Sequence, residues 1–339
     1  MSAPPVCWKC LGSKLKPKRN PTWSDVACNI CAGTGHMPAK RLKPARQQLP
    51  TRPVEAGWVT PGPDVAGVPA ELTEGEELSS LLGRWKIIQI RKGHRWSTDD
   101  LLTGFVAKHA PALPPPATHV DLGCGIGSVL LMMLFSFPAL HSVGVEAQPM
   151  SASMARRSVV FNGCADRAEV VDGDLRTFDS KGRKFDLVTG TPPYFAVRGP
   201  VDAAVPMYGS LPSFAQSAPA RFEMRGGLED YVAAGSRLVA DTGRVVVCEG
   251  DLDRQEPTRR VVAAAAACGL AVLETVLVVG KAGKFPLFAV HVLAPPPPPP
   301  SAAASKIRSF VVRGSDGKRT QEYNAMCADM GIPPYVEQQ

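Results

Sequence analysis

The sequence predicts an α/β fold: a mostly parallel, doubly wound sheet with a closing antiparallel hairpin, plus a small zinc-binding module at the amino end. Three observations support it. Strand-like and helical apolar runs alternate through the middle of the chain, a glycine-rich turn separates the first such strand from the first such helix, and two cysteine pairs stand near the amino end. A chain of 339 residues can hold one such domain and a small appendage.

The first element is the cysteine module, which we place at residues 1–50. Two Cys-x-x-Cys pairs are separated by 17 residues, a spacing typical of a structural zinc site with four thiolate ligands. Two disulfides or redox-active pairs are the alternatives. The remaining five cysteines are scattered singly and no secretory leader precedes Cys7, so a reducing compartment, the cytoplasm, fits better. The predicted zinc ligands are Cys7, Cys10, Cys28 and Cys31.

This module is strongly basic. Residues 1–52 hold ten of the 38 Lys and Arg residues but only one of the 31 Asp and Glu residues. Such a concentration of positive charge is expected of a segment that binds phosphates, and it favours RNA as the partner of the module. A solvated basic tail or a protein-binding module are the alternatives, and an organelle presequence is disfavoured by the paired cysteines and many prolines.

Residues 51–83 are rich in Pro, Gly and acidic residues and are predicted to be a linker, with a short helix possible over 71–82. The catalytic domain is predicted over 84–294. Its expected elements, by the period of their apolar residues, are 118–122, 128–136, 141–146, 149–162, 168–172, 185–190, 228–240, 243–249, 257–268 and 271–279, with a closing hairpin over 276–293.

The glycine-rich turn joins the strand at 118–122 to the helix at 128–136. Gly123, Gly125 and Gly127 follow Asp121 there, and glycine is needed where a ligand approaches the backbone closely. Alone the turn also fits nicotinamide enzymes or a surface loop. Two further acids, Glu146 and Asp174, end the next two strand-like runs. Each acid alone could be a solvated strand end, but the ordered series predicts a nucleotide site.

The fourth strand-like run, 185–190, ends in a proline turn, Thr191-Pro192-Pro193-Tyr194. The three acids followed by this turn resemble the class I S-adenosylmethionine-dependent methyltransferases, in the branch that methylates amines and carries an (Asn/Asp/Ser)-Pro-Pro-(Tyr/Phe) clamp. The resemblance implies that Asp121 and the glycines frame the donor methionine, Glu146 binds the ribose and Asp174 faces the adenine ring.

The resemblance also implies the catalytic residues, Thr191, Pro192, Pro193 and Tyr194. In the family the first residue and the following proline carbonyl accept hydrogen bonds from the target amine, and the aromatic ring stacks on the base. Thr191 departs from the usual Asn or Asp of adenine enzymes, although a serine hydroxyl stands there in related enzymes that methylate cytosine.

An upstream stretch, 93–102, resembles the bacterial tRNA-valine adenine amino methyltransferases. In that family it closes over the donor, which implies a cofactor-binding role for Asp99. This resemblance covers roughly 84–294. Residues 28–35 read Cys-x-x-Cys-x-Gly-x-Gly and resemble one repeat of the DnaJ-type cysteine-rich domain.

The long segment after Tyr194 is expected to face the substrate, so RNA, with tRNA preferred, is predicted to contact both it and the basic module. Residues 295–305 form a Pro/Ala spacer, and 306–339 a tail with a strand over 309–312 and a helix over 320–330 that can pack on the core. No apolar run is long enough to span a bilayer. The alternatives to an RNA adenine methyltransferase are a release-factor type glutamine methyltransferase and a non-catalytic RNA-binding descendant.

Overall fold

The computed structural model describes residues 57–110, 114–198, 215–296 and 305–333, together with short strands at 15–17, 23–27 and 205–206. The four predicted zinc ligands and most of the 295–305 spacer lie outside these residues. Within the module only the backbone of the antiparallel pair β1 (Leu15–Pro17) and β2 (Trp23–Ala27) is described. The zinc site therefore stays a prediction.

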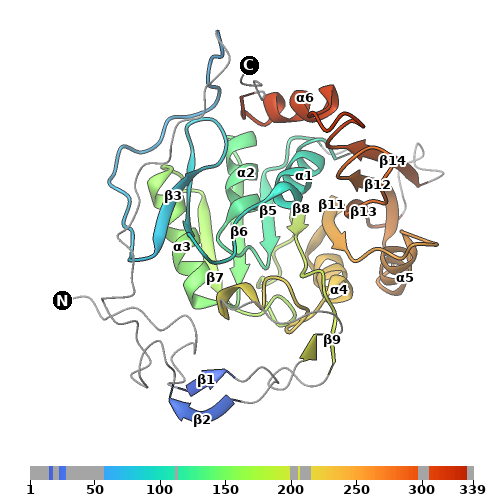
Figure 1. The fold of residues 1–339 in the computed structure, drawn as a ribbon, viewed down its shortest axis with the longest axis horizontal. Coiled ribbons are helices and arrows are strands. Elements are labelled where there is room, and N and C mark those ends of the chain that lie inside the picture. Colours follow the sequence, from blue (N-terminus) through green and yellow to red (C-terminus); the bar gives the residue numbers. More distant parts are fainter. Residues whose placement is uncertain are drawn as a thin grey trace.

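Eight strands of the described chain form one central sheet, in the order β14-β12-β13-β11-β8-β5-β6-β7 (Figure 1). Within this sheet β13 alone runs antiparallel to its neighbours, β11 and β12, and closes the hairpin that the sequence predicts. The mostly parallel fold class is confirmed. The strands are β5 Thr118–Leu122, β6 His141–Glu146, β7 Ala168–Asp172, β8 Phe185–Gly190, β11 Val239–Gly250, β12 Ala271–Val279, β13 Phe288–Ala294 and β14 Lys306–Val311.

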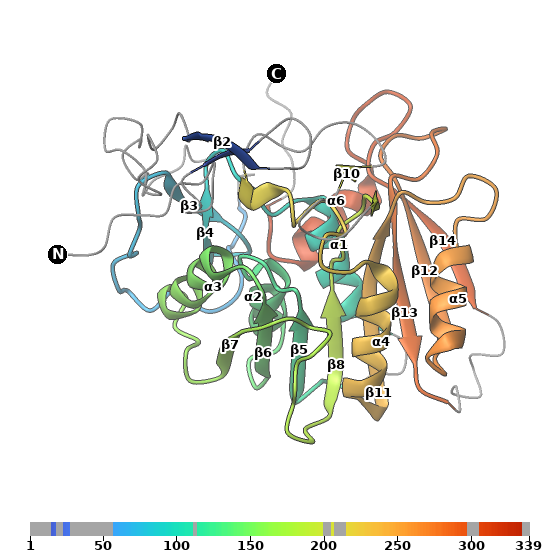
Figure 2. The ribbon, with the colours of Figure 1, turned by 90° about the horizontal axis from the view of Figure 1, so that it is seen from below.

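Helices cover both faces of this sheet, because its central strands carry apolar residues on both sides. On β11, Val246 and Cys248 pack toward one face, whereas Val245 and Val247 pack toward the other. Helices α1, α2, α3 and α6 cover the first face, and Figure 2 shows α4 and α5 lying along the second. The helices are α1 Thr98–Lys108, α2 Ser128–Ser136, α3 Pro149–Phe161, α4 Leu228–Leu238, α5 Arg259–Ala267 and α6 Gln321–Asp329.

Three short elements lie in the segment that follows β8. Strands β9 (Val197–Arg198) and β10 (Val205–Pro206) pair antiparallel, and a short 3-10 helix spans Ala215–Ser217. No helix of the described residues is long and apolar enough to cross a membrane.

The prediction of a linker over residues 51–83 is wrong for the second half of this range. Residues 76–80 form strand β3 (Glu76–Ser80), which pairs antiparallel with β4 (Lys86–Ile90), and no helix forms over 71–82. Leu78, Leu81 and Leu82 are buried in the core. The packed domain therefore begins before residue 84.

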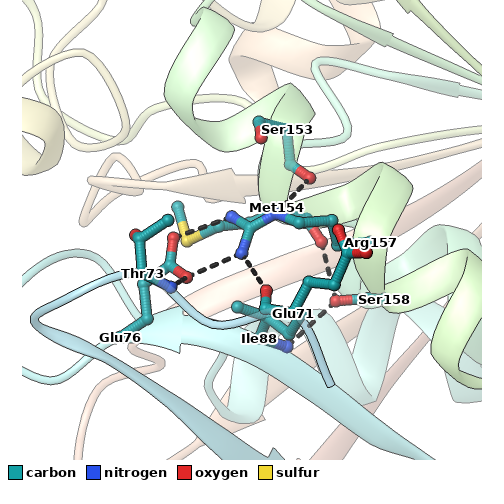
Figure 3. Close-up of polar contacts among 8 residues, drawn as sticks. All are labelled: Glu71, Thr73, Glu76, Ile88, Ser153, Met154, Arg157 and Ser158. Carbon is teal, nitrogen blue, oxygen red and sulfur yellow. Dashed lines mark hydrogen bonds and ion pairs between the residues drawn. The ribbon is translucent and has the colours of Figure 1, made fainter. Parts of the chain in front are cut away.

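Polar contacts join this hairpin to α3 (Figure 3). The Arg157 guanidinium donates to both carboxylate oxygens of Glu76, each at 2.7 Å, and to the carbonyl of Glu71. At the next residue of α3, the Ser158 hydroxyl accepts a hydrogen bond from the amide of Ile88 at 2.9 Å. Because Glu76 is buried, its charge requires the arginine, and the acidic composition that suggested a solvated linker instead marks an internal ion pair.

The tail packs on the core as expected. Strand β14 extends the sheet in parallel beside β12, and α6 follows it, in agreement with the strand and helix predicted from the tail sequence. Phe310 of β14 is 1% exposed, whereas Ile307 of the same strand is 55% exposed.

Replacing Phe310 with alanine should therefore lower the free energy of unfolding by about 3–5 kcal/mol, because a buried phenylalanine is lost and a cavity remains. The matched variant Ile307→Ala should change it by less than about 0.5 kcal/mol. Urea unfolding followed by circular dichroism measures both. Equal effects of the two substitutions would show that the tail does not belong to the folded core.

Candidate functional site

A cavity opens at the carboxyl ends of β5, β6 and β8, the edge at which parallel α/β sheets bind ligands. The turn after each strand contributes to its lining. Six of the residues singled out from the sequence are brought together here, and they are Gly123, Gly125, Glu146, Asp174, Thr191 and Pro193.

The floor of the cavity is the glycine turn between β5 and α2. Gly123, Gly125 and Gly127 have φ angles of 60°, 58° and 87°, which L side chains rarely adopt, and Gly127 caps α2. A Cβ at Gly125 would meet no protein atom closer than 4.0 Å, because the residue faces the cavity. The turn therefore leaves the backbone open to a ligand.

Glu146 holds this turn in place. One of its carboxylate oxygens accepts the Gly125 amide at 2.8 Å and the other accepts the Gln148 amide at 2.6 Å. Burial raises the pKa of Glu146. A carboxylate has about four acceptor sites, so two remain for the hydroxyl groups of a ligand.

Asp121 does not line the cavity. Its side chain is buried beneath the turn, where it accepts hydrogen bonds from the Thr189 hydroxyl at 2.7 Å and the Leu130 amide at 3.1 Å. Burial raises its pKa to about 7. Asp121 therefore connects β5, β8 and α2 below the site. It acts on a ligand indirectly, by positioning the glycine turn.

Asp174 lines the cavity but is already paired with Arg176. The arginine side chain donates to both carboxylate oxygens, at 2.9 and 2.6 Å, and its amide donates at 3.0 Å. These hydrogen bonds lower the pKa of Asp174, so the group is ionised at neutral pH. One acceptor position of this carboxylate remains for a ligand amine.

The proline turn at the end of β8 forms the mouth of the cavity. Thr191 and Pro193 line it, whereas Pro192 is buried. Tyr194 stands behind them: its hydroxyl donates to Asp99 at 2.9 Å and lies 3.1 Å from the Cys248 sulfur. Its ring stacks on Phe288 of β13, with the centroids 6.3 Å apart. The aromatic residue of the clamp is thereby fixed by three different elements.

The two acids that begin α1 have different environments. Asp99 accepts from Tyr194 and Ser97 and is not part of the cavity lining. Asp100 does line the cavity, and it accepts from the Ser97 amide and the Ser128 hydroxyl, both at 2.8 Å. Burial, together with neighbouring Asp99, raises the pKa of Asp100 to about 8.

Other lining residues were not singled out from the sequence as site residues. Tyr231 of α4 lies under Gly123 and Gly190, which have room for it only because they lack a Cβ. Gln216 and Arg225 come from the end of the segment after Tyr194, which was expected to face the substrate. His94 lies in the 93–102 stretch. Neither spacing nor residue type points to Gln216 or Tyr231 before the chain is folded.

Comparison with known proteins finds a match in the region around this cavity. Residues 120–203 match a family model described as a methyltransferase domain. That range contains the glycine turn, the three strand-end acids and the proline clamp. The mostly parallel sheet with helices on both faces is consistent with the class I S-adenosylmethionine-dependent methyltransferase fold.

Two kinds of name recur among the similar sequences. The tRNA1(Val) (adenine(37)-N6)-methyltransferase of Porphyromonas gingivalis is 28% identical over 172 residues, which cover 48% of this chain and 62% of the relative. The release factor glutamine methyltransferase of Caulobacter vibrioides is 32% identical over 130 residues, 35% of this chain and 43% of the relative. The chain thus spans less than two thirds of the length of these curated relatives. The crystal structure of a predicted O-methyltransferase from Agrobacterium tumefaciens is 15% identical, with a TM-score of 0.43, over 70% of this chain and 99% of that chain.

The cavity fits S-adenosylmethionine by its own chemistry. The open backbone at Gly125 provides room close to the turn, the free acceptor positions of Glu146 suit a ribose diol, and that of Asp174 suits an adenine amine. The methyl-bearing end would then lie toward the proline clamp, on the side of Asp100 and Thr191.

Proposed function

We propose that this protein transfers a methyl group from S-adenosylmethionine to the exocyclic amine of adenine in structured RNA, with tRNA as the preferred substrate. The observation that carries the proposal is the proline clamp: Thr191 and Pro193 line the mouth of the donor cavity, and Tyr194 is held next to them. The tRNA adenine methyltransferase names among the relatives support the choice of base.

Methylation of an aromatic amine requires such a clamp, because the lone pair of the amine is conjugated into the ring and the amine is therefore a poor nucleophile. In the proposal the Thr191 hydroxyl oxygen and the Pro192 carbonyl accept hydrogen bonds from the two N–H groups of the amine, and the base stacks on Tyr194 after leaving its helix. Positioning of the amine and stabilisation of the charge that develops on it supply the catalysis. S-adenosylmethionine, when bound, supplies an electrophilic methyl group on a sulfonium.

The basic amino-terminal module belongs to the same proposal. Its lysines and arginines would contact the phosphate backbone of the RNA, and zinc held by Cys7, Cys10, Cys28 and Cys31 would fold it. These contacts would add affinity without sequence information, whereas the clamp would select the base.

The proposal is tested with radiolabelled methyl donor and total small RNA, followed by digestion to nucleosides and identification of the labelled one. We expect label in adenosine methylated on its amine. Label in another nucleoside would refute the choice of base.

A protein amide is the second candidate substrate. The relatives named release factor glutamine methyltransferases favour it, and a planar amide can occupy the same clamp as a base amine. A parallel reaction with a bacterial release factor decides between the two. Label in the protein and none in the RNA would replace the RNA proposal with this one, and donor binding with no label in either would indicate a binding-only descendant.

A further inference from the structure

We propose that His94 accepts the proton that leaves the target amine during methyl transfer. This inference rests on the proposed function and assigns a residue to a step that the clamp alone does not complete. It concerns a side chain that neither the clamp nor the acids at the strand ends include.

The position of His94 carries the inference. It lies between β4 and α1 and lines the donor cavity together with Thr191 and Pro193 of the clamp. Its amide donates to the Gln216 side chain at 2.7 Å, which fixes the backbone at this point. Its imidazole forms no hydrogen bond to any residue that the structure describes, so both ring nitrogens are available to a ligand.

The carboxylates around the cavity are less suited to take the proton, because each already has partners. Asp99 accepts from Tyr194, and Asp174 is paired with Arg176. Glu146 accepts two backbone amides of the glycine turn. The cavity-lining Asp100 accepts hydrogen bonds from the Ser97 amide and the Ser128 hydroxyl.

Charged groups face His94 from several elements. Burial has the largest effect on the pKa of His94 and lowers it. Asp99 of α1 raises this pKa, and Arg221, from the segment after β9, lowers it. Asp100, Glu146, Asp174 and Arg225 share the cavity. The net result is a pKa below the ordinary value, so the imidazole is neutral at pH 7 and can accept a proton.

The clamp itself creates the need for an acceptor. The first residue of the clamp, Thr191, has a hydroxyl, and a hydroxyl oxygen is a weak base. In the proposed step the amine nitrogen forms a bond to the methyl carbon, and the electrons of the sulfur–carbon bond return to sulfur. The proton then passes from the methylated nitrogen to His94 and on to solvent.

The test is the rate of a single turnover with RNA, measured for the full chain between about pH 5 and pH 8. The wild-type rate should fall on the acid side below the ordinary histidine pKa, as His94 becomes protonated. His94→Gln should reduce the rate at pH 7 by roughly 100-fold and should lose this acid limb. The matched variant His141→Gln, at an exposed histidine at the start of β6 and the opposite end of the sheet, should retain both rate and profile.

A second variant distinguishes a role of His94 in proton transfer from a purely structural effect. His94→Ala should bind S-adenosylhomocysteine as the wild type does and should recover transfer when free imidazole is added. An unchanged pH profile in His94→Gln, or loss of donor binding without imidazole rescue in His94→Ala, would overturn the inference while the RNA activity of the wild type stands. If the wild-type protein transferred no methyl group to RNA, that result would refute the proposed function and this inference with it.

Discussion

Alanine in place of Gly250 is expected to reduce methyl transfer by on the order of 100-fold while leaving donor affinity unchanged. Gly250 ends β11 directly against the Tyr194 ring, and a Cβ there would lie 2.1 Å from a ring carbon. Such an approach is impossible, and the ring cannot yield easily, because its hydroxyl donates to Asp99 and it packs against Phe288. The aromatic part of the clamp must therefore shift.

The matched control is Gly280→Ala, in the hairpin between β12 and β13. The new Cβ would meet only the side chain of Leu287, which is 62% exposed and free to move. Single-turnover transfer and calorimetric titration with S-adenosylhomocysteine measure the two effects separately. Full activity in Gly250→Ala would show that the position of Tyr194 is irrelevant to transfer.

Substitution of Glu146 by glutamine is expected to weaken donor binding by about 10- to 100-fold. A glutamine can accept only one of the two backbone amides that the carboxylate now accepts, from Gly125 and Gln148, and its amino group would face the other donor. Both the position of the glycine turn and the acceptor for the ribose would be lost.

The control for this substitution is Glu169→Gln on the neighbouring strand β7, where the carboxylate is 61% exposed and lies 4.0 Å from Arg183. Calorimetric titration with S-adenosylhomocysteine should give the wild-type affinity for this variant. If Glu146→Gln also bound the ligand with wild-type affinity, the cavity would not be the donor site.

The sequence predicted the sheet because its central strands are short apolar runs that end in an acid or a glycine. Val120 and Leu122 lead into the glycine turn, and Val143 and Val145 lead into Glu146, so strand type and strand end are both visible. Such signals are local. They do not depend on which strand becomes the neighbour.

The β3–β4 hairpin was not predicted, since several of its buried positions are polar. Glu76, Glu77, Ser79 and Gln89 are all buried, and their partners, such as Arg157 and Arg95, lie far away in the sequence or outside the hairpin. A buried charge looks like a solvated one until its partner is known.

The same limit applies to the site. The sequence indicated both an acid at the start of α1 and a substrate-facing segment after Tyr194, but the fold decides which side chains reach the cavity. Asp100 lines the cavity and Asp99 instead holds Tyr194, a choice set by a rotation of one residue along the helix. His94, from the segment before α1, also lines the cavity.

The central claim, that this cavity holds the methyl donor with its reactive end at the proline clamp, is tested most directly by a crystal structure with S-adenosylhomocysteine. We expect the ribose hydroxyls at Glu146, the adenine amine at Asp174, and the sulfur facing Thr191 and Pro193. A ligand bound elsewhere, or one whose sulfur points away from the clamp, would contradict it.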